Sequence, residues 1–193
     1  MTLINRFTLH SSLEKYPDLD GCKGTLITAG LLWTALNLHI PQLSDYPYIG
    51  KDLPCTAFTA PNSLRNVKLR RFTRVQKDDV SLMTSSATGV LSVGIHAGYS
   101  LMAYRSGVYY DPRTCDSNSF PNHAVNLVGY GGGTDGGLKY WILRNSYGSS
   151  WGEEGYFRMS RDHDNTCHIN LTAIKIDFKC VDKEECERNL ENN

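Results

Sequence analysis

The pattern of apolar and polar positions divides the chain into a helical first part and a β-rich second part. Residues 25–38 carry apolar side chains at helical spacing, namely Leu26, Ala29, Leu32, Trp33, Ala35 and Leu36. Thr25 can cap the start of this helix, and Pro41 ends the run because a proline disfavours helical conformation in the residue before it. The pattern predicts a helix whose apolar side faces a core.

The second part of the chain changes to a period of two. Residues 67–70 and 72–75 alternate as half-buried strands do, and Asp78 or Asp79 can cap a short helix that runs to Ser86. Further strand-like runs, separated by glycine and polar clusters, lie at 90–96, 107–110, 123–130, 139–144, 155–160 and 169–176. Short strands at this spacing favour an antiparallel barrel or sandwich. The predicted fold class is therefore α+β.

Charge and composition exclude several kinds of partner. The 193 residues hold 20 basic and 20 acidic side chains, so the net charge of zero predicts no nucleic-acid partner. We also expect no membrane partner, because the strongly apolar stretch at 29–33 is far shorter than a membrane span. Six cysteines and the sequon Asn170-Leu171-Thr172 favour an oxidising compartment, whereas the first residues, MTLINRFTLH, predict no signal peptide.

Two segments of the β-rich part carry the residue types of a proton-transfer site. His123 opens an apolar strand that leads into a glycine-rich turn, and the next strand ends at Asn145. An imidazole can accept and donate a proton near neutral pH, and an amide can orient the ring without adding charge. A lone histidine before a strand is usually structural, but the order of histidine, strand, turn, strand and asparagine is more specific.

Several motifs extend this pattern over roughly residues 20–176. They are Asp20-Gly21-Cys22-Lys23-Gly24, Tyr46-Pro47-Tyr48 with Cys55, Ser92-Val93-Gly94-Ile95-His96-Ala97, Tyr104-Arg105-Ser106-Gly107-Val108-Tyr109, Asn122-His123-Ala124-Val125, Val128-Gly129-Tyr130-Gly131 and Asn145-Ser146-Tyr147-Gly148-Ser149-Ser150-Trp151-Gly152. In order and spacing the chain resembles the papain family of cysteine peptidases, in particular its cathepsin L-like group. The resemblance implies a papain-like two-lobe fold. We expect an incomplete helical lobe at 1–70, an antiparallel β-barrel-like lobe at 71–176 and a polar tail at 177–193.

The resemblance also implies roles for individual residues. His123 corresponds to the general base and acid, and Asn145 to the residue that orients it. The implied substrate-binding residues are Gly24, Leu26, Ile27, Gly94, Ala124 and Tyr147. Tyr147 stands where the family usually has a tryptophan that shields the histidine–asparagine bond, and Thr25 stands where the family has a second glycine. No cofactor and no metal are expected.

The nucleophile of the family has no counterpart in these residues. Its motif, Cys-Gly-Ser-Cys-Trp, does not occur, and a position about 130–150 residues before the histidine and asparagine falls ahead of Met1. The chain is therefore expected to be inactive alone. It is either an incomplete copy of a cysteine endopeptidase or a pseudoenzyme that acts as a peptide-binding or regulatory module. An unrelated β-sandwich, such as a lectin, would require the His123–Asn145 pattern to be accidental.

Further expectations about cysteines, partners and location follow from the resemblance. Cys115 and Cys167 match a disulfide of the family, whereas Cys22 and Cys55 lack their family partners and the pairing of Cys180 and Cys186 stays open. The expected partners are a peptide or protein, as substrate or ligand, and a protein inhibitor. The implied location is lysosomal or extracellular. Without the family's central helix, the 25–38 helix is expected to expose apolar surface.

Overall fold

The computed structural model describes residues 24–36, 67–116, 119–133, 137–163 and 165–180. Its elements, in chain order, are α1 (Ile27–Leu36), β1 (Val67–Arg74), α2 (Asp79–Ser86), β2 (Leu91–Ile95), α3 (Tyr99–Met102), β3 (Val108–Tyr109), α4 (Pro112–Cys115), β4 (His123–Gly131), β5 (Tyr140–Arg144), β6 (Tyr156–Ser160), a 3-10 turn (Thr166–His168) and β7 (Ile174–Cys180). None of the helices in these ranges is long and apolar enough to cross a membrane. Cys22, Cys55 and Cys186 lie outside the described residues.

Tertiary contacts divide the chain into two compact units. One is formed by Thr73–Ile176, and the other combines Thr2–Phe72 with Asp177–Asn193. The first unit contains α2 and most of the sheet, and the second contains α1. The division into 1–70, 71–176 and 177–193 stays a prediction about domains.

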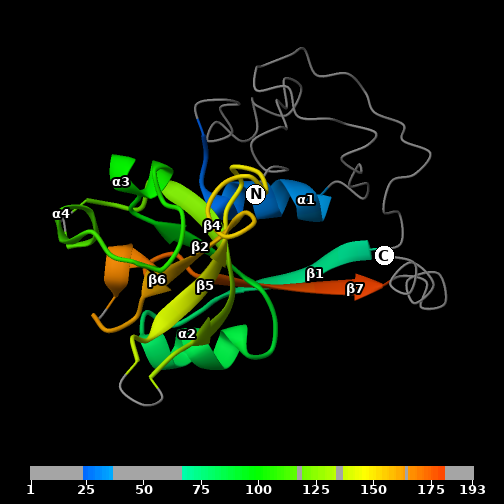
Figure 1. The fold of residues 1–193 in the computed structure, drawn as a ribbon. Coiled ribbons are helices and arrows are strands. Elements are labelled where there is room, and N and C mark those ends of the chain that lie inside the picture. Colours follow the sequence, from blue (N-terminus) through cyan, green and yellow to red (C-terminus); the bar gives the residue numbers. More distant parts are fainter. Residues whose placement is uncertain (1–23, 37–66, 117–118, 134–136, 164, 181–193) are drawn as a thin grey trace, which may run out of the picture. The chain divides into compact units, whose positions relative to one another are not determined.

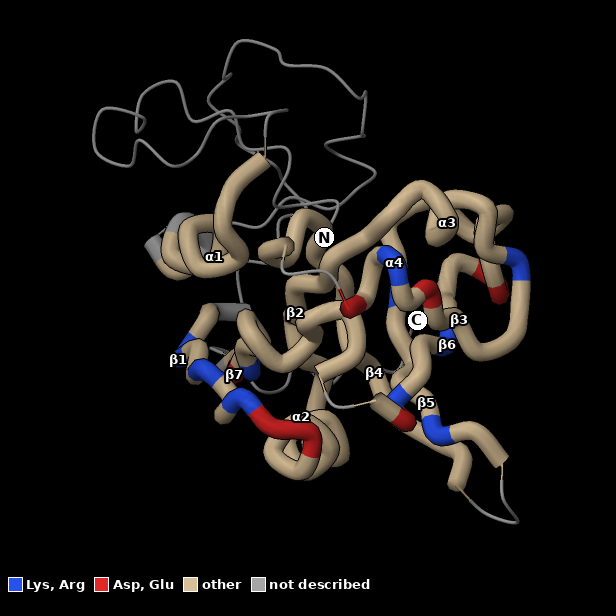
Figure 2. Tube along the Cα trace, turned by 90° about the vertical axis from the view of Figure 1, so that its left-hand side faces the viewer, with Lys and Arg blue, Asp and Glu red and all other residues tan. Residues whose placement is uncertain are grey.

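The strands form a seven-stranded sheet in the order β1-β7-β2-β4-β5-β6-β3 (Figure 1). β2 pairs antiparallel with β4, β4 with β5, and β5 with β6, as the sequence pattern led us to expect. The short edge strand β3 instead pairs parallel with β6, so the sheet is mixed rather than wholly antiparallel. Basic residues lie along β1, and acidic residues lie at the start of α2 (Figure 2).

The hydrophobic core of the first unit follows from the alternation of side chains along the inner strands. β5 buries alternate residues, β4 and β6 each bury three residues, and all five residues of β2 are buried. β2 lies between β7 and β4 in the sheet, so a continuous buried run suits its central position. The fully buried large side chains are Trp141, Phe157, Leu82, Leu91, Ile95, Leu101, Leu127, Leu143, Met159, Ile169, Val93 and Val125.

The short helix α2 begins where its cap predicts. Asp78 has an extended backbone, and its carboxylate accepts a hydrogen bond from the Ser81 N–H at 2.7 Å. This satisfies one of the N–H groups that have no partner within a helix. Of the two alternatives, Asp78 is therefore the cap, and Asp79 lies in the first turn.

Most predicted elements are confirmed, and one is displaced. The two runs at 67–75 form a single strand, β1, and helix α1 is shorter than predicted, beginning at Ile27. The strand predicted at 169–176 is wrong in its first half, because β7 starts at Ile174. Asn165, Cys167 and His168 have positive φ angles and fold residues 165–172 into turns instead. β7 then continues to Cys180, into the segment predicted to be a polar tail.

Candidate active site

The register of two neighbouring strands brings the predicted histidine and asparagine together. His123 is the first residue of β4, and Asn145 directly follows the last residue of β5. The two strands run antiparallel with Asn126 opposite Arg144, so the start of β4 and the end of β5 lie at the same end of the pair (Figure 1). His123 Nε2 and Asn145 Oδ1 are 2.9 Å apart.

The hydrogen bonds of Asn145 determine which ring nitrogen of His123 carries the proton. Asn145 Oδ1 also accepts a hydrogen bond from the Ser146 N–H at 2.8 Å, which identifies that atom as the carbonyl oxygen of the amide. An oxygen of this kind only accepts, so Nε2 of the neutral imidazole must donate. Nδ1 then keeps its lone pair and can take a proton. Among the described residues Asn145 Nδ2 has no hydrogen-bond partner, although it is buried.

Aromatic side chains cover this pair. The Tyr147 ring stacks on the His123 ring with 5.4 Å between centroids and 30° between planes. Trp151 meets Tyr147 edge to face at 5.3 Å, and its indole N–H donates to the Met102 carbonyl at 3.0 Å. Tyr147 thus covers one side of the His123 ring, with 40% of its own surface exposed.

Burial governs the titration of both rings. Burial lowers the pKa of His123 because the imidazolium loses hydration, while the hydrogen bond to Asn145 acts in the opposite direction. Burial likewise raises the pKa of the Tyr147 hydroxyl. The environment therefore favours a neutral imidazole, which can act as a base.

Two positioning features were not predicted from the sequence. The Asn122 side chain accepts from the Ala97 N–H at 2.8 Å and donates to the Ala97 carbonyl at 3.1 Å, which fixes the residue before His123. The carbonyl of Gly155 accepts a hydrogen bond from the Asn145 N–H at 2.9 Å. Asn122 was part of a quoted motif and Gly155 is one of 17 glycines, so neither residue type indicated this role.

The predicted substrate-binding residues belong to both compact units. Gly94 and Ala124 lie opposite each other in the β2–β4 pair, both buried, in the same unit as Tyr147. Leu26 is 64% exposed and Ile27 is buried, and both belong to the other unit. Gly24 in that unit is exposed and has a φ of 91°, which glycine adopts without strain.

Thr172 lies directly against Gly94 in the same unit. Thr172 Oγ1 accepts a hydrogen bond from the Gly94 N–H at 3.0 Å, and a Cβ added to Gly94 would clash with this oxygen. Such a Cβ would also come within 3.0 Å of Pro121 Cβ. Thr172 was missed because the predicted strand at 169–176 gave no reason to single out its side chain.

The structure joins Cys115 to Cys167, the pair implied by the resemblance. The bond links α4 to the 3-10 turn. Asn170 of the sequon is 4% exposed, so the fold buries the side chain that a glycan would modify. The described residues contain no group of three or more His, Cys, Asp or Glu side chains placed to hold a metal ion.

Comparison with known proteins places this arrangement in one family. Residues 11–176 match the family described as papain family cysteine protease. Procathepsin L of Mus musculus is 38% identical over 158 residues, which cover 80% of this chain and 46% of that protein. Digestive cysteine proteinase 3 of Homarus americanus is 40% identical over 152 residues, or 78% of this chain and 45% of that protein. The chain spans about half the length of these relatives.

Solved structures agree with the sequence comparison. Digestive procathepsin L 3 of the Tenebrio molitor larval midgut has a TM-score of 0.74 at 33% identity, covering 91% of this chain and 53% of that one. Bromelain protease of Ananas comosus, solved in complex with the E64 inhibitor, has a TM-score of 0.69 at 29% identity. That comparison covers 81% of this chain and 71% of the bromelain chain. The fold is α+β and papain-like.

Proposed function

The chain belongs to the papain family of cysteine proteases, and from that premise we propose that it carries the proton-transferring half of a cysteine endopeptidase site. His123 is the general base and acid, and Asn145 orients its ring. The observation that carries the proposal is the bond between His123 Nε2 and Asn145 Oδ1, which leaves Nδ1 free to accept a proton. The stacked Tyr147 supports it by limiting the access of water to that bond.

The reaction that fits this pair needs a thiol facing His123 Nδ1. The imidazole takes the thiol proton, the thiolate attacks the peptide carbonyl, and His123 returns the proton to the amine as the C–N bond breaks. Water then releases the acyl group, with His123 acting as base again. No cysteine among the 193 residues lies in the nucleophile motif of the family, so we propose that these residues alone do not hydrolyse peptides.

The proposed substrate is an extended peptide with an apolar side chain two positions before the cleaved bond. The proposed binding residues are Gly24, Leu26, Ile27, Gly94, Ala124 and Tyr147. Thr172 adds a hydroxyl at Gly94. Protein inhibitors of cysteine peptidases are the proposed regulatory partners. A lysosomal or extracellular location is proposed, in keeping with the disulfide.

A chimera that supplies the missing nucleophile tests this function. The N-terminal half of mouse procathepsin L, joined ahead of the matched residues, should give hydrolysis of a fluorogenic peptide and inactivation by E64, while the chain alone gives neither. In that chimera, His123→Ala should lower kcat/KM by about 10³-fold. His96→Ala, which removes an imidazole bound to the Phe120 carbonyl, is the matched control. A folded chimera in which His123→Ala retains full activity would reject the assigned role.

The alternative function is peptide binding without hydrolysis. Thr25 in place of the second glycine and Tyr147 in place of tryptophan favour it, because both are departures within the matched residues. Titration of the chain alone with a peptide that has an apolar residue two positions before a non-cleavable bond measures this directly. Saturable binding that Ala124→Trp abolishes would support the alternative, and an absence of binding would remove it.

A further inference from the structure

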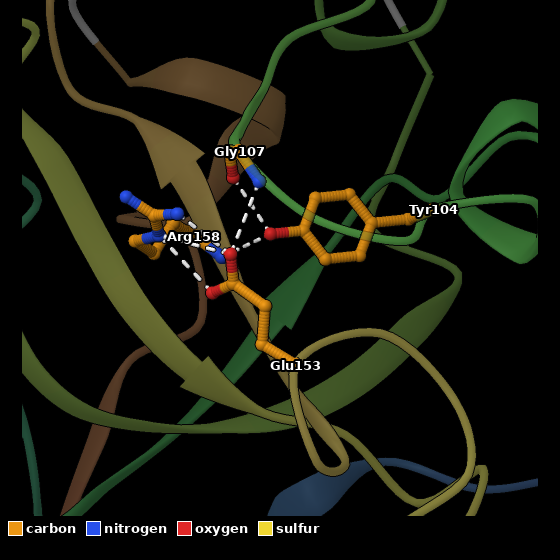
Figure 3. Close-up of polar contacts among 4 residues, drawn as sticks. All are labelled: Tyr104, Gly107, Glu153 and Arg158. Atoms are coloured by element: carbon orange, nitrogen blue, oxygen red, sulfur yellow. Dashed lines mark hydrogen bonds and ion pairs between the residues drawn. The ribbon is translucent and has the colours of Figure 1, made fainter.

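A charged cluster forms around Glu153, eight residues after Asn145 in the chain. The Glu153 carboxylate accepts hydrogen bonds from Arg158 Nη2 at 2.6 Å and from Arg158 Nε at 3.0 Å (Figure 3). Its Oε1 atom also accepts from the Gly107 N–H at 3.0 Å. The Tyr104 hydroxyl completes the cluster by donating to the Gly107 carbonyl at 2.6 Å. Arg158 lies on β6 and Gly107 just before β3, so the carboxylate joins the loop to two paired strands.

A tight turn connects Glu153 to the site. The Glu153 N–H donates to the Tyr156 carbonyl at 2.9 Å, and the Tyr156 N–H returns a bond to the Glu153 carbonyl at 3.0 Å. Glu154 and Gly155, between them, have φ angles of 55° and 89°, as a type I′ turn requires. The Gly155 carbonyl of this turn accepts the hydrogen bond from the Asn145 N–H. Glu153 therefore anchors the turn whose carbonyl holds the backbone of Asn145.

The same turn holds the aromatic cover. The Gly155 N–H donates to the Trp151 carbonyl at 2.8 Å, and Trp151 contacts both Tyr147 and Tyr104. Between Asn145 and Trp151 the chain has no regular secondary structure, and residues 146–150 are exposed. The anchor at Glu153 thus lies just beyond the exposed part of a loop that begins at the orienting asparagine.

We propose that Glu153 is a positioning residue, whose bonds to Arg158 and the Gly107 N–H hold the 145–156 loop so that Asn145 Oδ1 meets His123 Nε2. The inference rests on the proposed function of His123 and Asn145. The ion pair with Arg158 lowers the pKa of the Glu153 carboxyl, so the anchor stays charged under mildly acidic conditions. A purely structural role would stabilise the fold without affecting the tautomer of His123.

NMR of the His123 ring nitrogens in the 193-residue chain provides the test. The ¹⁵N chemical shifts of Nδ1 and Nε2 report which nitrogen carries the proton, with His123→Asn used to assign the signals. Wild type should show the Nε2–H tautomer. Glu153→Ala should shift both nitrogens toward values averaged between the two tautomers, and should speed the exchange of the Nε2 proton at least tenfold. Glu153→Gln, which keeps an acceptor for the Gly107 N–H, should show a smaller change in the same direction.

Asp78→Ala is the matched control. It also removes a carboxylate that accepts a backbone N–H, but at the start of α2. It should lower the melting temperature and leave the His123 signals unchanged. If Glu153→Ala does not fold, Glu153→Gln decides the outcome. Wild-type His123 shifts and exchange in a folded Glu153 variant would overturn the proposal.

The readout does not depend on hydrolysis. A chimera without activity whose His123 tautomer depends on Glu153 would reject the proposed function and keep the positioning role. An active chimera whose His123 tautomer is unchanged by Glu153→Gln would support the proposed function and reject the positioning role of Glu153.

Discussion

At the scale of single residues, the partly buried imidazole of His123 predicts a pH dependence of stability. Burial lowers its pKa in the folded state below the ordinary value of 6.5. The unfolded chain therefore binds the proton more readily, and the stability that the neutral ring contributes above pH 6.5 is lost as the pH falls through the folded pKa. The free energy of unfolding should decrease between pH 7.5 and pH 5.5, and His123→Gln should make that decrease smaller. Urea unfolding at each pH measures both.

The chosen pH range separates the effect of His123 on stability from the effect of the carboxylates. Asp111 accepts a hydrogen bond from Ser100, and Glu153 is bound to Arg158, so the pKa values of both are lowered. Their contributions are present above the ordinary carboxyl pKa and disappear at lower pH than the range used for His123. His96→Gln, which removes an imidazole elsewhere in the unit, is the comparison. An unchanged slope in His123→Gln would contradict the prediction.

A second residue-scale prediction concerns the contact between Gly94 and Thr172. Gly94→Ala should cost about 1–3 kcal/mol, because the new methyl group displaces Thr172 Oγ1 and its hydrogen bond to the Gly94 N–H. With Thr172→Ala already present, the same substitution should cost less, with a coupling of about 0.5–3 kcal/mol. Chemical denaturation of the two single variants and the double variant measures it.

Gly129→Ala is the control for that cycle. A Cβ at Gly129 meets only Ile142 Cδ1 at 3.8 Å, an ordinary contact, so this variant should show no coupling with Thr172→Ala. Additive costs for Gly94→Ala and Thr172→Ala would contradict the prediction.

How far the sequence predicts individual roles depends on what each role requires. His123 and Asn145 lie within motifs, so the resemblance identifies them without coordinates. The tautomer of His123 follows only from the second bond to Asn145 Oδ1, which comes from the Ser146 backbone. Backbone contacts of this kind, including the one from Gly155, are independent of side-chain type and leave no pattern in the sequence.

At the scale of elements, the disulfide ties the short helix α4 to the 3-10 turn. Cys115 in α4 and Cys167 in the 3-10 turn are 52 residues apart and both buried. Closing a loop of this length restricts the unfolded chain, so replacing both cysteines with serine should lower the free energy of unfolding by about 4 kcal/mol. Denaturation of the double variant measures the loss, and wild type under reducing conditions should approach the same value.

Alkylation before and after reduction provides the independent check. Cys115 and Cys167 should be blocked in the native protein and react only after reduction, as peptide mass analysis would show. Reaction of both thiols without reductant would contradict the pairing.

Elements are predictable where local rules agree with tertiary contacts. α2 follows from its aspartate cap, and β4 and β5 follow from their alternation. The segment before β7 could not be predicted in this way. Residues 169–173 have the apolar composition of a strand, but the positive φ angles before them impose a turn. Likewise, β7 continues to Cys180 because it pairs with β1, a partner about 100 residues earlier that a local pattern cannot identify.

At the scale of the whole molecule, the β-rich unit and the segment around α1 differ in how far their described apolar side chains are buried. The first unit has a continuous core around β2, β4, β5 and β6 and a disulfide. In α1, Ile27 and Leu31 are buried and Leu32 is 37% exposed, while Leu26, just before the helix, is 64% exposed. The two relatives named above are about twice as long as this chain.

The mass of the native protein is therefore the measurement that separates the two functions. If the peptidase hypothesis holds, the protein isolated from its source should be clearly heavier than 21.6 kDa, begin ahead of Met1 and contain Cys-Gly-Ser-Cys-Trp. It should also react with E64, because the thiolate would face His123. A stable, soluble species of 21.6 kDa that begins at Met1 and does not react with E64 would contradict the peptidase hypothesis. That outcome would favour the peptide-binding alternative, since His123 and Asn145 would then have no thiol to activate.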